Sequence, residues 1–520
     1  MTANSRKRRR DRNSSAAMLA KRSKPPALNP APPGPIGGQY KPLTEIQLQQ
    51  IYDTSLRMLA ELGMGDAPPA LTEQALKCGA TINRSGRLCF SRGMVEDIIA
   101  GACQSFVLHG RDPRHSFEVG GERVYFGTGG AAVQTLDLDS HIYRPSTLAD
   151  LYGFTCLADT LANISWFTRC CVATDVPDIF ELDVNTAYCL MCGTQKPVGT
   201  SFTLCDHVDP IVDMFDQVAG GAGKFTEKPF CKGHISPIIS PMRYGEDAFN
   251  VALACIKRGM PLNCIIAAMS GATSPATIDG MLAASFAETL AALVMVNIFA
   301  PGYPVIFSNW PFVIDLRSGA FCGGGGEISL LNAAAAQMAN HIGVPSGVAS
   351  SMSDAKAVDA QMGMEKALSS LACGLSGANL VYESCGMMAS LLGVSYEAFI
   401  TDDEMLSHVY RMIRGIEVTE ATLAFESMKN IIAGDGHFIG ESQTMQAMER
   451  DYFYPRFGDR LEPATWAEQG AQNIWQKTNR QAKDILAQHR PNYIAAAVDK
   501  KIRSTFNIKI ENPALTASLF

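Results

Sequence analysis

Zinc-binding and redox motifs are scarce in this sequence. Its 15 cysteines are scattered over 520 residues, and Cys189-Leu-Met-Cys192 is the only C-x-x-C pair. No second pair follows at the spacing of a zinc site, and the surrounding residues do not resemble the βαβ unit of a thioredoxin-type protein. This cysteine usage is typical of a reduced cytosolic protein, and it favours a structural pair over a redox-active one.

Long apolar runs are also missing. The basic N-terminus is not followed by an apolar segment, so no signal peptide is predicted. Residues 281–300 form the most apolar window of helix length, but Glu288 and Asn297 interrupt it. The window predicts a buried helix rather than a membrane span, and we expect a cytoplasmic protein with no membrane partner.

Charged residues make up only 18% of the chain, and the formal net charge is −7. Such a protein offers no overall attraction for nucleic acid. The exception is the N-terminal tail, because nine of the first 24 residues are Lys or Arg and residues 25–35 are rich in proline. A nuclear signal or a nucleic-acid contact is one interpretation. A solvated, disordered tail with a Pro-rich linker is the favoured one.

What the sequence does contain is a regular series of short apolar runs, in a chain whose 47% hydrophobic residues can build a large core. The eight runs are 124–127, 166–171, 197–202, 229–236, 262–269, 304–310, 345–352 and 379–386. Segments with helical periodicity alternate with them, among them 147–160, 208–219, 248–258, 276–298, 327–342 and 359–375. Eight strand-helix units without a nucleotide-binding fingerprint predict a (β/α)8 TIM barrel rather than a doubly wound α/β sheet.

Four regions follow from this pattern. We expect a disordered basic and Pro-rich tail over residues 1–40 and an N-terminal cap of helices and short β segments over 41–120. The barrel is expected over 121–396, and a C-terminal helical extension over 397–520. In a TIM barrel the functional site lies at the C-terminal ends of the strands.

The residues predicted at those ends are rich in hydroxyl, amide and aromatic groups. They include no cluster of metal-ligand character and no G-x-S-x-G elbow, so no bound metal is expected. A methylated ammonium ion is bound by aromatic faces, with an ordinary place in the barrel core as the alternative for each ring. The aromatic candidates are Tyr125, Trp166, Phe202, Trp310 and Tyr382.

Polar and charged candidates complete this rim. An acidic side chain would offset the charge of a cation, and Glu383 and Asp354 are the candidates. A basic side chain would receive a carboxylate if the substrate has one, and the candidates are Arg169, Lys232 and His234. The other predicted rim residues are Asn309, Ser351 and Met352.

Three further segments allow two interpretations each. The glycine-rich residues 127–130 and 323–326 would suit a phosphate, but neither has the Lys-Ser/Thr of a P-loop, so a tight turn is favoured. Residues 435–440 (DGHFIG) match D-x-H-x-x-G, by which corrinoid-carrying domains present a His to cobalt. Because they lie in the predicted helical extension, we favour a turn in which His437 faces a partner.

Many segments resemble, in the same order, the trimethylamine methyltransferase family of corrinoid-dependent enzymes. They include 110–117, 126–133, 143–150, 271–276, 315–327, 353–361, 377–393, 414–418 and 436–440. In founding members of that family, pyrrolysine directly precedes Ser-Asp-Ala-Lys, which stands here at 353–356. Met352 holds the preceding position, so the chain is identified as a member of the family of the type without pyrrolysine.

The resemblance implies a (β/α)8 barrel that passes a methyl group from a methylated amine to the cob(I)alamin of a separate corrinoid protein. No cofactor is then bound permanently, and Glu383, Asp354 and Met352 are the candidate catalytic residues. Met352 cannot activate trimethylamine as pyrrolysine does, so we expect a quaternary amine such as glycine betaine, proline betaine, carnitine or choline. The corrinoid partner is expected to dock over the barrel rim near His437, and barrels of this kind commonly form homo-oligomers.

Two other functions remain open. Lys232 or Lys356 would serve a lyase or aldolase barrel as a Schiff-base residue, provided that burial lowers its pKa. A quaternary-amine-binding or regulatory barrel without turnover would bind the ligand but transfer no methyl group.

Overall fold

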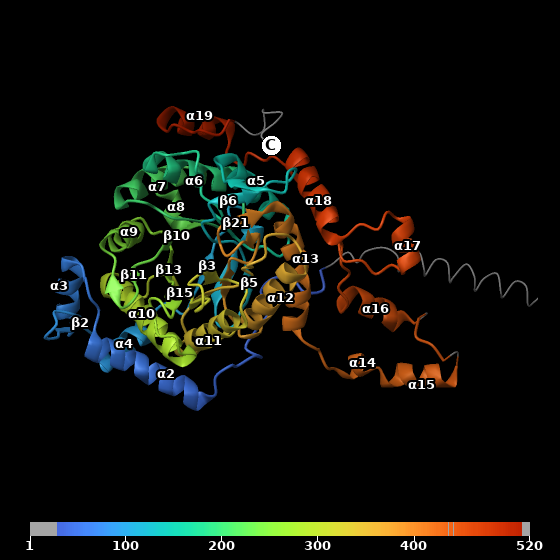
Figure 1. The fold of residues 1–520 in the computed structure, drawn as a ribbon, viewed down its shortest axis with the longest axis horizontal. Coiled ribbons are helices and arrows are strands. Elements are labelled where there is room, and N and C mark those ends of the chain that lie inside the picture. Colours follow the sequence, from blue (N-terminus) through green and yellow to red (C-terminus); the bar gives the residue numbers. More distant parts are fainter. Residues whose placement is uncertain (1–28, 435, 440, 512–520) are drawn as a thin grey trace, which may run out of the picture.

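The structure is a computed structural model that describes residues 29–511, except 435 and 440 (Figure 1). The basic cluster of the N-terminal tail lies outside the described residues. So do Asp435 and Gly440, the first and last residues of the D-x-H-x-x-G segment.

Eight short parallel strands form the centre of the molecule. Their order is β5-β19-β18-β15-β13-β10-β9-β8. The two end strands also meet, because Phe126 and Ile164 form a parallel bridge and Ser165 N donates to Phe126 O at 2.8 Å, which closes the barrel. The strands are β5 (Tyr125–Phe126), β8 (Phe167–Thr168), β9 (Val198–Thr200), β10 (Cys231–Ile235), β13 (Leu262–Ile266), β15 (Val305–Asn309), β18 (Ser346–Ala349) and β19 (Leu380–Tyr382). Each lies within one of the eight predicted runs, so the predicted barrel is confirmed.

A ring of helices surrounds the strands (Figure 1). Its members are α5 (Leu148–Thr160), α6 (Ile179–Gly193), α7 (Val208–Ala219), α9 (Glu246–Lys257), α10 (Ile278–Phe299), α11 (Gly326–Ile342), α12 (Ala360–Leu375) and α13 (Tyr396–Arg414). The short α8 (Lys224–Glu227) follows α7. Cys189 and Cys192 lie buried in α6, and burial raises the pKa of both thiols, that of Cys192 to about 12. Both thiols therefore stay protonated, as expected of a structural pair.

Helix α13 is the eighth helix of the ring, although the expected boundary at residue 396 assigns it to the C-terminal extension. It packs between α12 and α5, so it completes the circle that starts at β5. Tyr410 of α13 accepts a hydrogen bond from Phe126 N at 3.0 Å. The helix is amphipathic rather than uniformly apolar, and its period resembles that of the helices that follow, so its sequence alone does not separate it from them.

Helix α10 carries the apolar window around Glu288. Among the described residues it is long and apolar enough to span a membrane, but 83% of that window is buried inside the fold. It packs on β13, β15, α2 and α11. Glu288 accepts hydrogen bonds from Ser240 Oγ at 2.6 Å and Met242 N at 2.7 Å. The predicted buried helix is what the structure contains.

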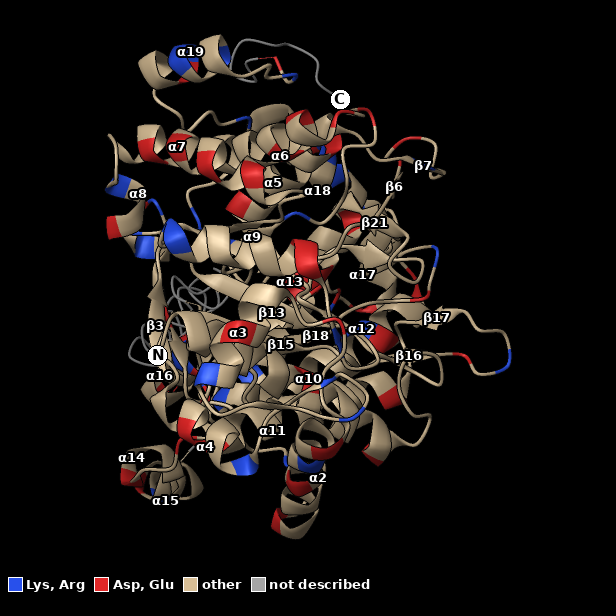
Figure 2. Ribbon diagram, turned by 90° about the vertical axis from the view of Figure 1, so that its left-hand side faces the viewer, with Lys and Arg blue, Asp and Glu red and all other residues tan. Residues whose placement is uncertain are grey.

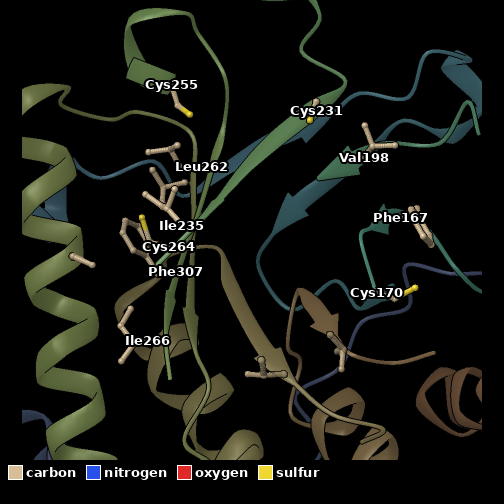
Figure 3. Packing of buried hydrophobic residues seen from close by; sticks show 14 of the residues in the cluster. Phe167, Cys170, Val198, Cys231, Ile235, Cys255, Leu262, Cys264, Ile266 and Phe307 are labelled. Carbon is tan, nitrogen blue, oxygen red and sulfur yellow. The ribbon is translucent and has the colours of Figure 1, made fainter. Parts of the chain in front are cut away.

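Side chains on the barrel strands alternate between the barrel interior and the surrounding helices. Figure 3 shows part of the outer layer, with Ile235, Leu262, Cys264 and Phe307 on neighbouring strands and Cys255 of α9 beside Leu262. The residues between them in sequence point inward. The interior positions of β10 are therefore Lys232 and His234.

Short β segments lie around both ends of the barrel. The N-terminal cap contains α2 (Glu45–Arg57), the π-helical η1 (Met58–Leu62), α3 (Pro69–Lys77), β1 (Thr81–Ile82), β2 (Leu88–Cys89), α4 (Arg92–Gly101), β3 (Ser105–Leu108), η2 (Pro113–His115) and β4 (Phe117–Gly120). At the rim two small sheets have the orders β20-β21-β6-β7 and β14-β16-β17. Their strands are β6 (Gln134–Leu136), β7 (Tyr143–Pro145), β14 (Met269–Ser270), β16 (Phe312–Ile314), β17 (Phe321–Cys322), β20 (Met387–Met388) and β21 (Gly393–Ser395). Strand β9 is followed by the 3-10 turn η3 (Cys205–His207). Strand β10 is followed by a hairpin of β11 (Ile238–Ile239) and β12 (Arg243–Tyr244).

The C-terminal extension has two parts. Helices α18 (Ile474–Gln488) and α19 (Ala496–Thr505) pack on the barrel, α18 against α13 and α5 and α19 against α7. Helices α14 (Glu420–Leu423), α15 (Phe425–Ala433) and α16 (Ser442–Arg450) project from it as an arm, with α17 (Pro463–Glu468) beyond (Figure 1). In Figure 2 the arm lies at the end of the molecule opposite the β16–β17 hairpin.

Candidate functional site

Three large aromatic side chains converge inside the barrel. The ring of Tyr382 lies 5.2 Å from that of Trp166 and 5.4 Å from that of Trp310, measured between centroids. His234 adds a fourth ring, 5.8 Å from Trp310 and 5.7 Å from Tyr382. We call these four residues the interior ring cluster. Their spacing is that of direct edge and face contacts between aromatic rings.

The polar groups of this cluster are buried without hydrogen-bond partners. Within the described chain no acceptor meets the indole N–H of Trp166 or Trp310, and no partner meets the Tyr382 hydroxyl. Both amide atoms of Asn309, the last residue of β15, are also unpartnered, but Asn309 has the outward parity of Val305 and Phe307 and is not counted with the cluster. Buried polar atoms are normally paired, so a group of orphans at one place marks a ligand site.

Lys232 lies directly beside these rings. Its Nζ is 5.2 Å from the centroid of Trp166 and 5.3 Å from that of Tyr382, and it donates to Thr168 Oγ1 at 3.1 Å. The side chain is fully buried, and burial lowers the pKa of Lys232 to about 7. A buried ammonium next to aromatic faces is thus part of the site.

His234 is held as a neutral ring. Ser308 Oγ donates to Asn263 Oδ1, which leaves the Asn263 amide N–H to donate to His234 Nδ1 at 3.2 Å. Burial, together with the positive charges of Lys232 and Arg169, holds the pKa of His234 well below its usual range. The ring proton then lies on Nε2, which can donate to a ligand.

Glu383 follows Tyr382 in a left-handed backbone conformation, with φ of 61°. Its carboxyl group lies against the backbone of the 127–130 turn, where a Cβ added at Gly130 would be 2.6 Å from Glu383 Oε2. That oxygen has no partner in the described chain, and burial raises the pKa of Glu383 to about 8 although nearby Lys366 opposes the shift. The glycines of this turn thus make room for a buried carboxyl group, in line with the tight-turn interpretation.

Asp354 acts as a clamp between loops rather than as a free carboxylate. It accepts hydrogen bonds from Gly323 N at 2.8 Å, Gly324 N at 3.2 Å and Ser390 Oγ at 2.8 Å. Two of the N–H groups that a phosphate would need at 323–326, those of Gly323 and Gly324, are therefore already bonded to a carboxylate. Met352 lies near this clamp, buried in the same apolar cluster as Trp310 and Tyr382.

Three predicted site residues lie elsewhere. Tyr125 is the first residue of β5, so it lies at the N-terminal end of the barrel, where it stacks on Phe117 at 4.2 Å and lines a cavity of about 570 Å³. Phe202 is buried in the large core cluster that excludes the interior rings. Ser351 points to α12, since its hydroxyl pairs with that of Ser370 and its N–H donates to Ser369 Oγ at 2.9 Å. The prediction that these three line the rim is wrong, because strand position alone does not decide which way a side chain points.

Arg169 and His437 are the remaining candidates. Arg169 follows β8, is partly exposed, and lies close enough to His234 to lower its pKa. His437 is exposed between α15 and α16, on the arm. Because α13 runs from the rim back to the N-terminal end, where Arg414 donates to Pro30 O at 2.7 Å, the arm starts at the end opposite the rim. The expectation that His437 forms part of the rim surface is therefore wrong.

Sequence reasoning missed the residues that orient the site. Thr168 holds Lys232, and Asn263 holds His234. The sequence could have pointed to Asn263, since an amide inside the apolar strand LNCII is unusual. Nothing in the sequence points to Thr168, because threonine is common in strands. Among the described residues no three His, Cys, Asp or Glu side chains come together as a metal site.

The chain matches the model of the family described as trimethylamine methyltransferase (MTTB) over residues 4–511. It belongs to this family. The expected resemblance is thereby confirmed: the family is one of methylamine and betaine methyltransferases.

Its relatives include enzymes with different named substrates. The chain is 29% identical to a glycine betaine methyltransferase of Desulfitobacterium hafniense (strain Y51), over 90% of this chain and 96% of the relative. It is 28% identical to a trimethylamine methyltransferase MttB of D. hafniense (strain DSM 10664 / DCB-2), over 88% of this chain and 92% of the relative. The trimethylamine methyltransferase MttB of Methanosarcina barkeri is also 28% identical, over 90% and 95%.

Among solved structures, the monomethylamine methyltransferase MtmB of Methanosarcina barkeri is similar with a TM-score of 0.49 and 13% identity. The match covers 85% of this chain and 92% of that chain.

Proposed function

We propose that this family member transfers a methyl group from a quaternary amine, such as glycine betaine, to the cob(I)alamin of a separate corrinoid protein. The observation that carries the proposal is the interior ring cluster. Trp310 and Tyr382 offer aromatic faces to a methylated cation, which binds such faces in desolvated sites with about 2 kcal/mol. Phe312 extends these faces toward the rim, with its ring 6.1 Å from that of Trp310.

The position of Met352 supports a quaternary amine over trimethylamine. Met352 is buried in the same apolar cluster as Trp310, at the sequence position where the pyrrolysine-containing relatives are expected to carry their electrophile. A thioether fills space and is no electrophile toward an amine. The substrate is therefore one that needs no activation.

A quaternary nitrogen meets this condition. When the methyl carbon bonds to cobalt, the electron pair of the broken C–N bond stays on nitrogen, and the leaving group is a neutral tertiary amine. No proton has to be supplied. The barrel then binds the cation, turns one methyl group toward the rim, and excludes water. Glu383 would offset the cation once its proton is released.

The corrinoid protein is proposed to dock over the rim formed by the β14-β16-β17 and β20-β21-β6-β7 sheets. This is the end of the barrel at which Trp310 lies, one residue beyond β15. His437, at the other end, has no part in this docking surface.

Thermal shift with glycine betaine, choline and trimethylamine, followed by cob(I)alamin methylation, tests the proposal. A quaternary amine is expected to raise the midpoint and to methylate cob(I)alamin, and trimethylamine to do neither. Trp310→Leu should weaken binding tenfold or more, while Trp466→Leu on α17 should leave it unchanged. Binding without transfer would identify a binding protein without turnover, and no response to any quaternary amine would overturn the proposal.

One observation favours a second function. Lys232 is buried and its lowered pKa is the condition that a Schiff-base lysine needs. Lys356 fails that condition, because it is exposed and donates to Asp354 O at 2.6 Å. Borohydride trapping of Lys232 with carbonyl compounds would reveal a lyase or aldolase.

A further inference from the structure

Lys232 differs from the other buried lysines of this molecule. Lys196 donates to three carbonyl oxygens, of Ala158 and Leu161 at 2.6 Å and of Ile164 at 2.7 Å. Lys366 forms an ion pair with Asp402 at 2.8 Å.

Lys232 has one acceptor, the hydroxyl of Thr168, and no ion pair with any carboxylate in the described chain. An ammonium carries three donors, and a buried one without a counter-ion is costly. Acceptors are missing at this position of the barrel.

The neighbouring groups are donors too. The indole N–H of Trp166 and the hydroxyl of Tyr382 have no partner in the described chain, and both rings touch Lys232. The indole N–H can only donate. The titratable or charged groups around Lys232 are Tyr382 on β19, His234 and the outward-pointing Cys231 on its own strand, and Arg169 after β8, which like Lys232 acts on His234. None of them is a carboxylate, so the missing acceptor has to come from a ligand.

We infer that Lys232 receives a carboxylate of the substrate, which is therefore a zwitterion with the methylated ammonium at one end and a carboxylate at the other. The inference rests on the proposed function and narrows it, since it selects betaines over choline. The ring cluster alone accepts both kinds of ligand.

The position of Lys232 along the barrel gives the substrate a direction. Lys232 is the second residue of β10, near the N-terminal end of the barrel, and Trp310 lies beyond the C-terminal end of β15. A carboxylate on Lys232 places the ammonium near Trp310, with its methyl groups toward the rim. That is the orientation in which a partner docked at the rim can take a methyl group.

Three ligands of nearly equal shape distinguish the contribution of the carboxylate end from that of the ammonium end. Glycine betaine has both charges, choline lacks the carboxylate, and 3,3-dimethylbutanoate keeps the carboxylate but has carbon in place of nitrogen. Wild type should bind glycine betaine at least tenfold more tightly than choline. Lys232→Met should weaken the binding of glycine betaine and of 3,3-dimethylbutanoate at least tenfold. It should leave the affinity for choline within about threefold of the wild-type value. Lys257→Met, which removes an exposed lysine at the end of α9, is the matched control and should change none of them.

Proton uptake gives a second readout on wild type alone. Lys232 is largely neutral at about pH 8, so a carboxylate that binds it should draw a proton onto it. Calorimetry of 3,3-dimethylbutanoate in two buffers of different ionisation enthalpy should show this uptake. Choline should show no uptake and should instead release a proton from Glu383, whose pKa is raised to about 8.

The outcomes separate this inference from the proposed function. If Lys232→Met loses affinity for choline and for glycine betaine equally, the inference is overturned. The same holds if 3,3-dimethylbutanoate does not bind to wild type, or binds without proton uptake. If no quaternary amine binds but 3,3-dimethylbutanoate binds through Lys232, the carboxylate site stands and the proposed function falls.

Discussion

At the scale of single residues, the site holds two ionisable groups with opposite shifts. Burial lowers the pKa of Lys232 to about 7 and raises that of Glu383 to about 8. Near neutral pH, both groups are therefore largely or partly uncharged when no ligand is bound. A zwitterionic ligand would stabilise the charged form of each group. The two groups are then charged only when the ligand supplies a partner of opposite charge, and the empty site avoids buried unpaired charges.

Glu383→Gln is predicted to stabilise the fold in a pH-dependent way. The ordinary pKa of the carboxyl group is 4.5 and its folded value is about 8, so between these values the folded state holds a proton that the unfolded state has lost. Wild-type stability from this group therefore falls as pH rises from about 4.5 to about 8. Glutamine does not titrate, so the gain should be near zero at about pH 4.5 and a few kcal/mol, in order of magnitude, above about pH 8.

Urea unfolding of both proteins at the two pH values measures this gain. The same variant should bind choline at least tenfold more weakly at high pH, where wild-type Glu383 is ionised. If the stability gain is equal at both pH values, the pKa of Glu383 is not raised by burial and the prediction is wrong.

At the scale of elements, the strand-to-helix loops depend on the Asp354 clamp. The carboxylate joins the segment after β17 to the loop that contains Ser390. The residues at 389–391 all have positive φ without being glycine, so this loop is strained and needs its tether.

Asp354→Ala is predicted to loosen the β16–β17 hairpin. Arg317 at its turn is exposed, so trypsin should cleave there faster in the variant than in wild type, by about tenfold if one or two hydrogen bonds hold the loop closed. Asp247→Ala at the start of α9 removes an exposed carboxylate away from the loop and is the control. Unchanged cleavage at Arg317 would show that other contacts hold the hairpin.

At the scale of the whole molecule, the arm contributes little to the barrel. Among its described residues from 416 to 450, Ile431 is the one that is buried. Apolar side chains are exposed along it, with Ile416 88%, Phe425 71% and Ile432 76% accessible. The two ends of the arm meet at Arg411, which donates to Gly415 O at 2.8 Å and Asp451 O at 2.6 Å.

Replacement of residues 416–450 by a short Gly-Ser linker is therefore predicted to leave the barrel folded. The thermal midpoint should change by no more than about 2 °C, because almost no buried apolar surface is lost. Ligand binding should be unchanged as well. A midpoint that falls by about 10 °C would show that the arm supports the barrel.

Light scattering on both proteins measures whether the expected homo-oligomer depends on the arm.

The sequence by itself determined the eight strands, most of the ring helices and the family. Each depends on local pattern: apolar runs of strand length, helical periodicity, and motifs such as Ser353-Asp-Ala-Lys356 in a fixed order. The sequence also proposed Trp166, Lys232, His234, Trp310 and Tyr382 as site residues, and their side chains meet inside the barrel. It did not show that Trp166 and Lys232 lie toward the N-terminal ends of their strands rather than at the rim.

Only the tertiary structure decided which charges have partners. Asp354 is satisfied by the N–H groups of Gly323 and Gly324, while Lys232 is left without a counter-ion. Such pairings join residues far apart in the chain, and they depend on the closure of the barrel and the path of each loop. No local pattern encodes them, because the free energy of a buried charge is set by every group that surrounds it.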